Sequence, residues 1–269
     1  MRQPLVLLAV LGALLSMPGC STGTPPSPTS TPVWTATPAP KATPMPPVVF
    51  IGDSVSMGAF TSTTDNIFVV RVHNDLKTRS GIDPTNDVVW TMNPYDDLVN
   101  ARRVAAEHRK LAIVELGVHW AAFDATQFRE IYGAMLDCLA GSGATVVVGT
   151  IPWLNWRPDS PVYFEMAYFS QIIREEAAKR GIAVADLWAA TDQRADAVSR
   201  PGQPCFTDPM CRGDNYHPGD IGHGLIAEAY TRALDAALAN PPQPNDGRCD
   251  FDKYLNALAN GLPVPVDGP

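Results

Sequence analysis

A serine stands where a short apolar segment ends, in the run Gly52-Asp53-Ser54. The segment before it, residues 48–51, has the composition of a buried strand. A serine in a strand-to-helix turn is exposed above a parallel sheet, with its backbone N–H at a helix N-terminus. Such a position suits a nucleophile and an oxyanion donor. Because Gly, Asp and Ser also form ordinary turns, this motif alone is weak evidence for catalysis.

A second motif, Asp214-Asn215-Tyr216-His217-Pro218, lies far along the chain and directly before an expected helix. An aspartate three residues before a histidine can accept the Nδ1–H within one loop, which leaves Nε2 to take a proton from a serine. The alternative is that Asp214 caps a turn and His217 is an exposed residue before a helix. Both motifs in one chain favour a catalytic triad of Ser54, His217 and Asp214.

Strand-like and helix-like segments alternate from Val48 onward and would position these side chains. Strands are expected at 48–51, 87–92, 111–116, 144–151 and 182–187. Helices are expected at 69–80, 96–110, 123–140, 162–180 and 222–239. The alternation predicts an α/β fold with one five-stranded parallel sheet, covered by helices on both faces. Active sites of such sheets lie at the carboxyl ends of the strands, where Ser54 is expected.

Together the two motifs resemble the SGNH, or GDSL-type, serine esterase family over residues 48–240. Gly52-Asp53-Ser54 matches the family's nucleophile block, with Val55 in place of Leu, and Asp214-x-x-His217 matches its acid–base block. The resemblance implies a three-layer α/β/α sandwich of flavodoxin-like topology. It also implies hydrolysis of ester bonds by a chain that uses no metal and no cofactor.

Two inner blocks depart from the family pattern, and both concern the oxyanion hole. The family usually has Gly-x-Asn-Asp after the third strand, with the Asn donating to the oxyanion. Here Gly117 is followed by Val118-His119-Trp120, so His119 replaces Asn and Trp120 replaces Asp. The family's Gly after the second strand is also missing, because residues 82–116 contain no Gly. We expect N–H groups of Ser54, Asn93 and His119 to form the hole instead.

Aromatic residues suggest where a substrate would bind. Trp153 and Trp156 lie in a Pro-bounded loop after the fourth expected strand, and with Trp120 they are candidates for an apolar or sugar-stacking wall. Part of the aromatic stretch that continues to Phe169 is better explained as helix core. The remaining histidines, His73, His108 and His223, show no metal-ligand spacing and are expected at the surface or within helices.

The expected activity is hydrolysis of acyl esters, such as O-acetyl groups on carbohydrate or other small or lipid esters. The alternative is a catalytically weakened binding module that keeps the fold and uses the cleft for recognition. Retention of Ser54, Asp214 and His217 favours the enzyme, whereas His119 and the absent Gly favour the module. A formal charge of −8 argues against nucleic acid as a partner. A monomer is expected.

The N-terminus has the features of an export signal. Residues 5–15 are an apolar run too short to span a bilayer, and Gly19-Cys20 resembles a bacterial lipobox. Residues 20–47 are rich in Pro, Thr and Ser and are expected to form a disordered tether. The expectation is a signal peptide at 1–19 and a protein anchored through lipidated Cys20 to the outer face of a bacterial membrane. Ordinary secretion is the alternative.

Four cysteines remain after Cys20, an even number that suits an oxidising compartment. Cys205 and Cys211 close the shortest loop, so the favoured pairing is Cys205–Cys211 with Cys138–Cys249, among three possible connectivities. A zinc site is the alternative, but the ligand spacing for it is lacking. Residues 241–269 are expected to be an extension that packs on the domain and is pinned by Cys249.

Overall fold

The described part of the chain is built around one parallel sheet. A computed structural model of the protein describes residues 48–80, 87–91, 93–120, 123–199, 216–239 and 249–261. All of these residues belong to one compact unit, Pro44–Pro269.

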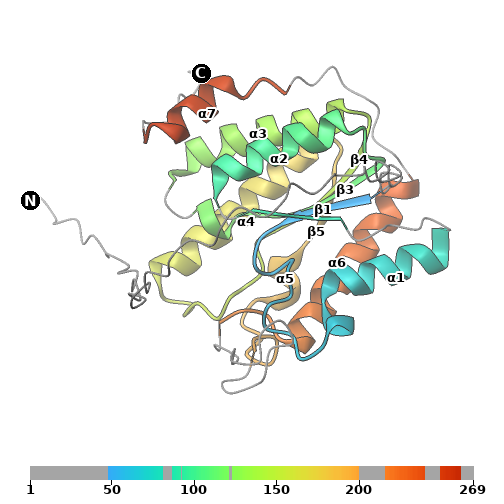
Figure 1. The fold of residues 1–269 in the computed structure, drawn as a ribbon. Helices are drawn as coiled ribbons and strands as arrows, with labels where there is room; N and C mark the ends of the chain where they lie inside the picture. Colours follow the sequence, from blue (N-terminus) through green and yellow to red (C-terminus); the bar gives the residue numbers. More distant parts are fainter. Residues whose placement is uncertain are drawn as a thin grey trace, which may run out of the picture. The chain divides into compact units, whose positions relative to one another are not determined.

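The sheet contains the strands β1 (Val48–Gly52), β2 (Val88–Trp90), β3 (Leu111–Glu115), β4 (Thr145–Gly149) and β5 (Ala183–Ala185). The strand order is β2-β1-β3-β4-β5, and each neighbouring pair is parallel (Figure 1). β1 and β3 are buried along their whole length, as expected for strands covered on both faces. The predicted five-stranded parallel sheet is therefore confirmed.

Helices cover both faces of the sheet and complete a three-layer sandwich (Figure 1). α1 packs with α6 on one face, while α2, α3 and α4 pack side by side on the other. Their bounds, with those of the two shorter helices, are α1 (Phe68–Ser80), α2 (Pro94–Ala106), α3 (Ala125–Gly141), α4 (Pro161–Lys179), α5 (Leu187–Thr191), α6 (Asp220–Ala239) and α7 (Asp252–Ala259). Among the helices in the described ranges, none has the length and apolar character needed to span a bilayer.

The helix starts are set by capping residues. Asn93 precedes α2 and accepts the Asp96 backbone N–H at 3.0 Å, while Pro94 occupies the first helical position. This cap explains why α2 begins before the predicted residue 96. Ser160 and Pro161 start α4 in the same way.

The segment after Ser54 differs from the expectation. Turns, not a helix, follow β1 through residue 60, and α1 begins only at Phe68. Gly58 explains the interruption, because its φ of +66° is left-handed and a Cβ there would lie 2.4 Å from Ile67 Cγ1. The prediction that the Ser54 N–H begins a helix is therefore wrong.

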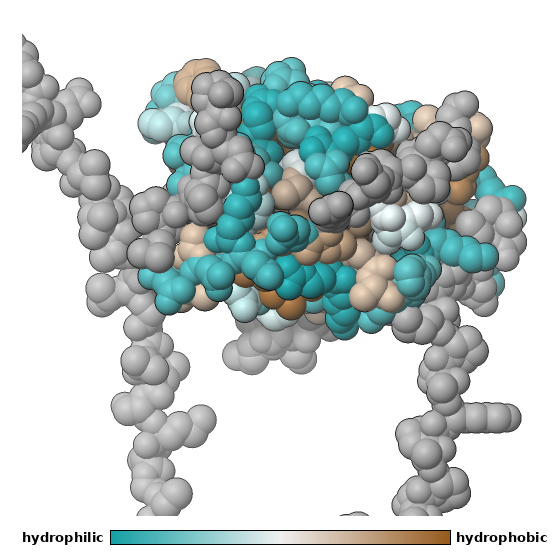
Figure 2. Space-filling model, turned by 90° about the horizontal axis from the view of Figure 1, so that it is seen from above, coloured by the Kyte–Doolittle hydropathy of each residue, from teal (hydrophilic) through white to brown (hydrophobic). Residues whose placement is uncertain are grey.

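The C-terminal segment packs against the helices that cover one face of the sheet. A disulfide joins Cys138 in α3 to Cys249, which precedes α7. Arg102 in α2 donates to Asp252 at 2.9 Å and lies over the Phe251 ring. Seen from the side on which α2, α3 and α7 lie, the described surface is mostly hydrophilic (Figure 2). The Cys138–Cys249 pairing predicted from the sequence is thus present.

Several predictions concern residues outside the described ranges. They are the Cys205–Cys211 pairing, the signal and tether in residues 1–47, and lipidation of Cys20. These remain predictions.

Candidate active site

The structure brings Ser54 and His217 together at the carboxyl end of β1. Ser54 follows the strand after one intervening residue, and His217 lies 163 residues later, just ahead of α6. The distance from Ser54 Oγ to His217 Nε2 is 3.1 Å, which is hydrogen-bonding distance. Nε2 is therefore placed to take the hydroxyl proton when Ser54 attacks an electrophile.

The backbone around His217 is held by its neighbours. Ser199 N–H donates to the His217 carbonyl at 2.7 Å, and Gly219 N–H donates to the Ala197 carbonyl at 2.8 Å. Gly222 lets the start of α6 approach closely, because a Cβ at this position would lie 2.1 Å from Ala197 O. These contacts fix the segment that carries the histidine.

Aromatic side chains fix the orientation of the histidine ring. The Phe60 ring stacks on His217 with a centroid distance of 4.3 Å and an interplanar angle of 11°. Tyr216 packs edge-on against the His217 ring with a centroid distance of 5.4 Å, and its hydroxyl accepts the Trp156 indole N–H at 2.9 Å. The His217 imidazole is thus packed against two aromatic side chains.

A carboxylate joins the nucleophile loop to the helix that follows His217. Asp220, in the first turn of α6, accepts the Ser62 N–H at 2.8 Å and the Ser62 hydroxyl at 2.6 Å. An acidic side chain in a first turn is also favoured by the helix dipole. This bridge ties the loop of Ser54 to the segment of His217.

Asp214, the predicted third member of the triad, lies outside the described residues. Its role as the group that orients His217 remains a prediction.

Two predicted oxyanion donors have other contacts in the structure. The Asn93 side chain caps α2, and its amide also donates to Asp96 at 2.8 Å, so only its backbone N–H could serve an oxyanion. His119 Nε2 is buried and lies 3.7 Å from Asp53 Oδ2, too far for a hydrogen bond. The His119 side chain keeps 29% of its surface exposed. His119 therefore lies beside the nucleophile turn, with one nitrogen directed at Asp53.

The three tryptophans predicted to contact substrate are core residues. Trp120 is fully buried and donates to Asp97 at 2.7 Å, so it offers no surface to a ligand. Trp153 and Trp156 are 5% and 9% exposed, and the Trp153 indole N–H donates to the Trp156 carbonyl at 2.9 Å. Both indoles contact other residues of the protein, and Trp156 holds Tyr216, which packs against His217.

Exposed apolar side chains occur elsewhere near the end of β1. Trp90 ends β2, is aligned with Gly52 in the sheet, and is 48% exposed. Tyr95 in the first turn of α2 and Met57 in the turn after Ser54 are exposed as well. Sequence reasoning passed over these residues, although the position of Trp90 at a strand end was a usable signal.

The comparison with protein families decides the classification. Residues 50–225 match the model of the GDSL-like lipase/acylhydrolase family. The chain belongs to this family. It is therefore an ester-hydrolysing serine hydrolase, as the resemblance in its motifs implied.

Solved structures with a similar fold support the family's architecture here. An acetyl xylan esterase, AlAXEase, is 20% identical, with 70% of this chain and 98% of that chain covered at a TM-score of 0.52. TesA is 19% identical, with the same coverage and a TM-score of 0.53. A lipase/acylhydrolase from Enterococcus faecalis is 20% identical, with 74% and 97% covered at 0.51. A comparison with curated proteins found no match.

Two buried groups near the site of this GDSL-family chain have strongly shifted pKa values. Burial raises the pKa of Asp97 to about 7, against the opposing effect of hydrogen bonds from Thr91 and Trp120. Folding stability that depends on protonated Asp97 is therefore lost as the pH rises from about 4 through 7. Burial lowers the pKa of His223 to about 3, and its Nδ1 accepts the Phe68 N–H at 3.3 Å. His223, expected in a helix or at the surface, is a neutral buried side chain of α6.

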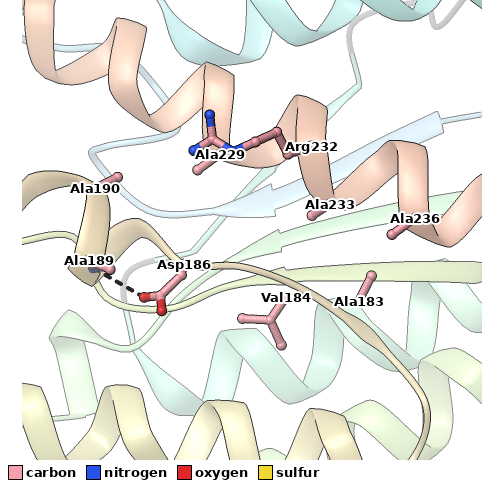
Figure 3. Close-up of a pocket in the computed structure, with 9 residues that line it drawn as sticks. All are labelled: Ala183, Val184, Asp186, Ala189, Ala190, Ala229, Arg232, Ala233 and Ala236. Atoms are coloured by element: carbon pink, nitrogen blue, oxygen red, sulfur yellow. Dashed lines mark hydrogen bonds between the residues drawn. The ribbon is translucent and has the colours of Figure 1, made fainter.

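A separate pocket of about 450 Å³ lies between β5, α5 and α6 and contains none of the family's motif residues. Its walls are mainly alanine side chains, with Asp186 and Arg232 at its margin (Figure 3). Asp186 accepts both an Ala189 N–H and the Arg174 guanidinium, so its carboxylate serves the packing of α4 and α5. Nothing in this pocket resembles the arrangement at Ser54.

Proposed function

We propose that the protein hydrolyses acyl esters with Ser54 as nucleophile, His217 as general base and Asp214 as the residue that orients His217. The observation that carries this proposal is the 3.1 Å contact between Ser54 Oγ and His217 Nε2. Two further contacts that hold the His217 segment also support it: the Ser199 N–H donates to the His217 carbonyl, and Asp220 accepts the Ser62 N–H.

The chemistry follows from this contact. Ser54 Oγ attacks the ester carbonyl carbon while its proton passes to His217 Nε2. The tetrahedral intermediate collapses, the alcohol oxygen leaves with the proton from His217, and an acyl-serine remains. Water then attacks the acyl-serine while losing a proton to His217. His217 returns this proton to Ser54 Oγ as the carboxylic acid is released. N–H donors beside Ser54 stabilise the oxyanion in both steps.

The substrate class that we propose is short acyl esters, including O-acetyl groups on carbohydrate. The exposed Trp90 and Tyr95 offer aromatic surfaces of the kind that stack on sugar rings. One fold neighbour is described as an acetyl xylan esterase and another as a lipase/acylhydrolase. The carbohydrate and lipid esters are therefore the two arms of the test.

The test is a panel of p-nitrophenyl esters from acetate to octanoate, together with acetylated oligosaccharide assayed by acetate release. We expect turnover to fall as the acyl chain lengthens, and acetate release to require Ser54. Ser54→Ala is the control in each assay. Hydrolysis confined to long-chain esters would favour a lipid substrate, and no Ser54-dependent turnover would contradict the proposal.

The binding-module alternative has one observation in its favour. His119 stands where the family has its oxyanion Asn, and its Nε2 faces Asp53, so this nitrogen does not replace the amide donor of that Asn. Binding of acetylated oligosaccharide with equal affinity by wild type and Ser54→Ala, without turnover by either, would support this alternative.

We further propose that the protein is exported and anchored through Cys20. If Cys20 carries lipid, Cys20→Ala should move the protein from the membrane fraction to the soluble fraction, because one signal for anchoring is removed. The measurement is fractionation of cells followed by immunoblotting, with Cys249→Ser as the control for loss of a cysteine. Unchanged fractionation of Cys20→Ala would contradict the anchor.

A further inference from the structure

Glu115, the last residue of β3, holds the turn that carries Ser54. Its side chain is buried, with 1% of its surface exposed. The Ser56 hydroxyl donates to Glu115 Oε2 at 3.0 Å. The Asp53 backbone N–H also donates to the Glu115 carboxyl group, and the carboxyl groups of Asp53 and Glu115 lie within hydrogen-bonding range of each other. Glu115 therefore contacts the residues on both sides of the nucleophile.

A hydrogen bond between two carboxyl groups requires one proton. Asp53 Oδ2 and Glu115 Oε1 are both buried, and neither has a hydrogen-bond donor among the described residues. Two ionised carboxylates at this distance in a buried site would repel each other, whereas one protonated group satisfies both oxygens. One carboxyl group of the pair is therefore neutral, and the other is negatively charged.

The surroundings of the pair place the proton on Glu115. Asp53 Oδ1 accepts the Val55 N–H at 2.9 Å, and the charges of His119 and His217 favour ionised Asp53. Burial raises the pKa of Asp53 despite these contacts. Burial and the charge of Asp53 raise the pKa of Glu115 well above its ordinary value, and hydrogen bonds such as that from Ser56 only partly oppose this.

Other ionisable groups face the pair from the packed helices. These groups are Asp97 on α2, Tyr132 on α3 and Tyr230 on α6. None of the three can provide a positive charge to Glu115. The Tyr230 hydroxyl donates to the Val114 carbonyl at 2.7 Å.

We propose that Glu115 is a positioning residue that works in its protonated form, donating to Asp53 while accepting from the Asp53 N–H and the Ser56 hydroxyl. This set of hydrogen bonds fixes the backbone on both sides of Ser54 and so the direction of its Oγ. It also leaves Asp53 as a negative group beside His119. The activity part of this inference rests on the proposed function, whereas the protonation part does not.

Glutamine is the variant that mimics a protonated glutamate. In Glu115→Gln the amide NH₂ donates to Asp53 and the amide oxygen accepts from Ser56 and the Asp53 N–H. Glu115→Leu has a similar volume but makes none of these bonds. The pair of variants separates hydrogen bonding from filling of space.

The first arm of the experiment measures melting temperature between pH 5 and 8. An unfolded glutamate ionises near pH 4.3. Because the pKa is raised in the folded protein, the stability contributed by Glu115 is full below the unfolded pKa and is lost as the pH rises toward the folded pKa. Glutamine carries no such loss. The Tm of Glu115→Gln should therefore gain on wild type by about 3 °C for each pH unit.

Glu176 on α4 is the matched control for this arm. It is also a buried glutamate, but Arg129, Lys179 and Arg180 all pair with it. These hydrogen bonds outweigh burial and lower its pKa, so Glu176 is ionised in the folded state. Glu176→Gln should therefore lose Tm relative to wild type above pH 5. A Tm difference for Glu115→Gln that is flat or falls with pH would show that Glu115 is ionised and overturn the proposal.

The second arm measures the reactivity of Ser54 toward a fluorophosphonate probe and toward p-nitrophenyl acetate. Glu115→Gln should retain both rates within about threefold, and Glu115→Leu should lower kcat by about 10²-fold with less effect on KM. Loss of activity in Glu115→Gln equal to that in Glu115→Leu would overturn the positioning role. If wild type itself turns over no ester, the proposed function fails, and the Tm arm still decides the protonation. If Glu115→Leu does not fold, the Tm of Glu115→Gln against wild type still decides the protonation, and a loss of activity in Glu115→Gln would still overturn the positioning role.

Discussion

Replacing Ser54 or His217 with alanine should lower kcat on p-nitrophenyl acetate by about 10⁴- to 10⁶-fold. Ser54→Ala removes the atom that becomes acylated, and His217→Ala removes the base that lies 3.1 Å from it. Because the two groups act in one step, the double variant should be no slower than either single one. Steady-state kinetics at substrate saturation provides the measurement.

His108→Asn is the control for loss of a histidine. His108 is exposed after α2 at a φ of +50°, a conformation that Asn tolerates. It should keep the wild-type rate. Additive losses in the Ser54 and His217 double variant would mean that the two residues do not act together, and would contradict the mechanism.

His119→Ala should lower kcat by about 10²-fold with little change in KM, if the ring donates to the oxyanion. The structure adds a condition on this donor. Because Nε2 faces the buried Asp53, the ring nitrogen left to donate to an oxyanion is Nδ1.

His119→Asn provides the comparison, since it restores the amide donor that the family usually has at this position. His119→Asn should keep or raise kcat relative to wild type. The measurement is kcat at substrate saturation for wild type, His119→Asn and His119→Ala. A neutral effect of His119→Ala would mean that the oxyanion hole is formed without this residue.

The sheet and the Ser54–His217 pair were predictable because their signals are local. Apolar β-branched segments such as 144–151 reveal buried strands, and parallel strands place their carboxyl ends at one edge. The motif at Gly52-Asp53-Ser54 and the histidine ahead of the last long helix then meet at that edge. The prediction required only the order of segments along the chain.

The roles of buried side chains were not predictable in the same way. Trp120 and Trp156 were expected at a binding surface, yet each indole N–H finds a partner within the protein, at Asp97 and Tyr216. Such pairings depend on residues far apart in sequence, and one sequence does not reveal them. The same applies to Glu115. The sequence indicates only that it ends a strand, and its contacts with Asp53 and Ser56 become apparent only in the structure.

The loop after Ser54 shows a third limit. Turns replace the expected helix there because Gly58 is left-handed and packs closely against Ile67, and neither feature can be predicted from a glycine in the sequence. By contrast, the Cys138–Cys249 pairing was reached by counting, because the shortest loop was assigned to the other two cysteines.

The Cys138–Cys249 disulfide closes a ring of chain that contains His217 but not Ser54. A protease that cuts once between Cys138 and His217 would place Ser54 and His217 on different fragments, yet the disulfide would keep the fragments covalently joined. On a gel the nicked protein would run as one band without reductant and as two bands with it. The enzyme could therefore survive a cut that, in a chain without this crosslink, would let its two halves diffuse apart.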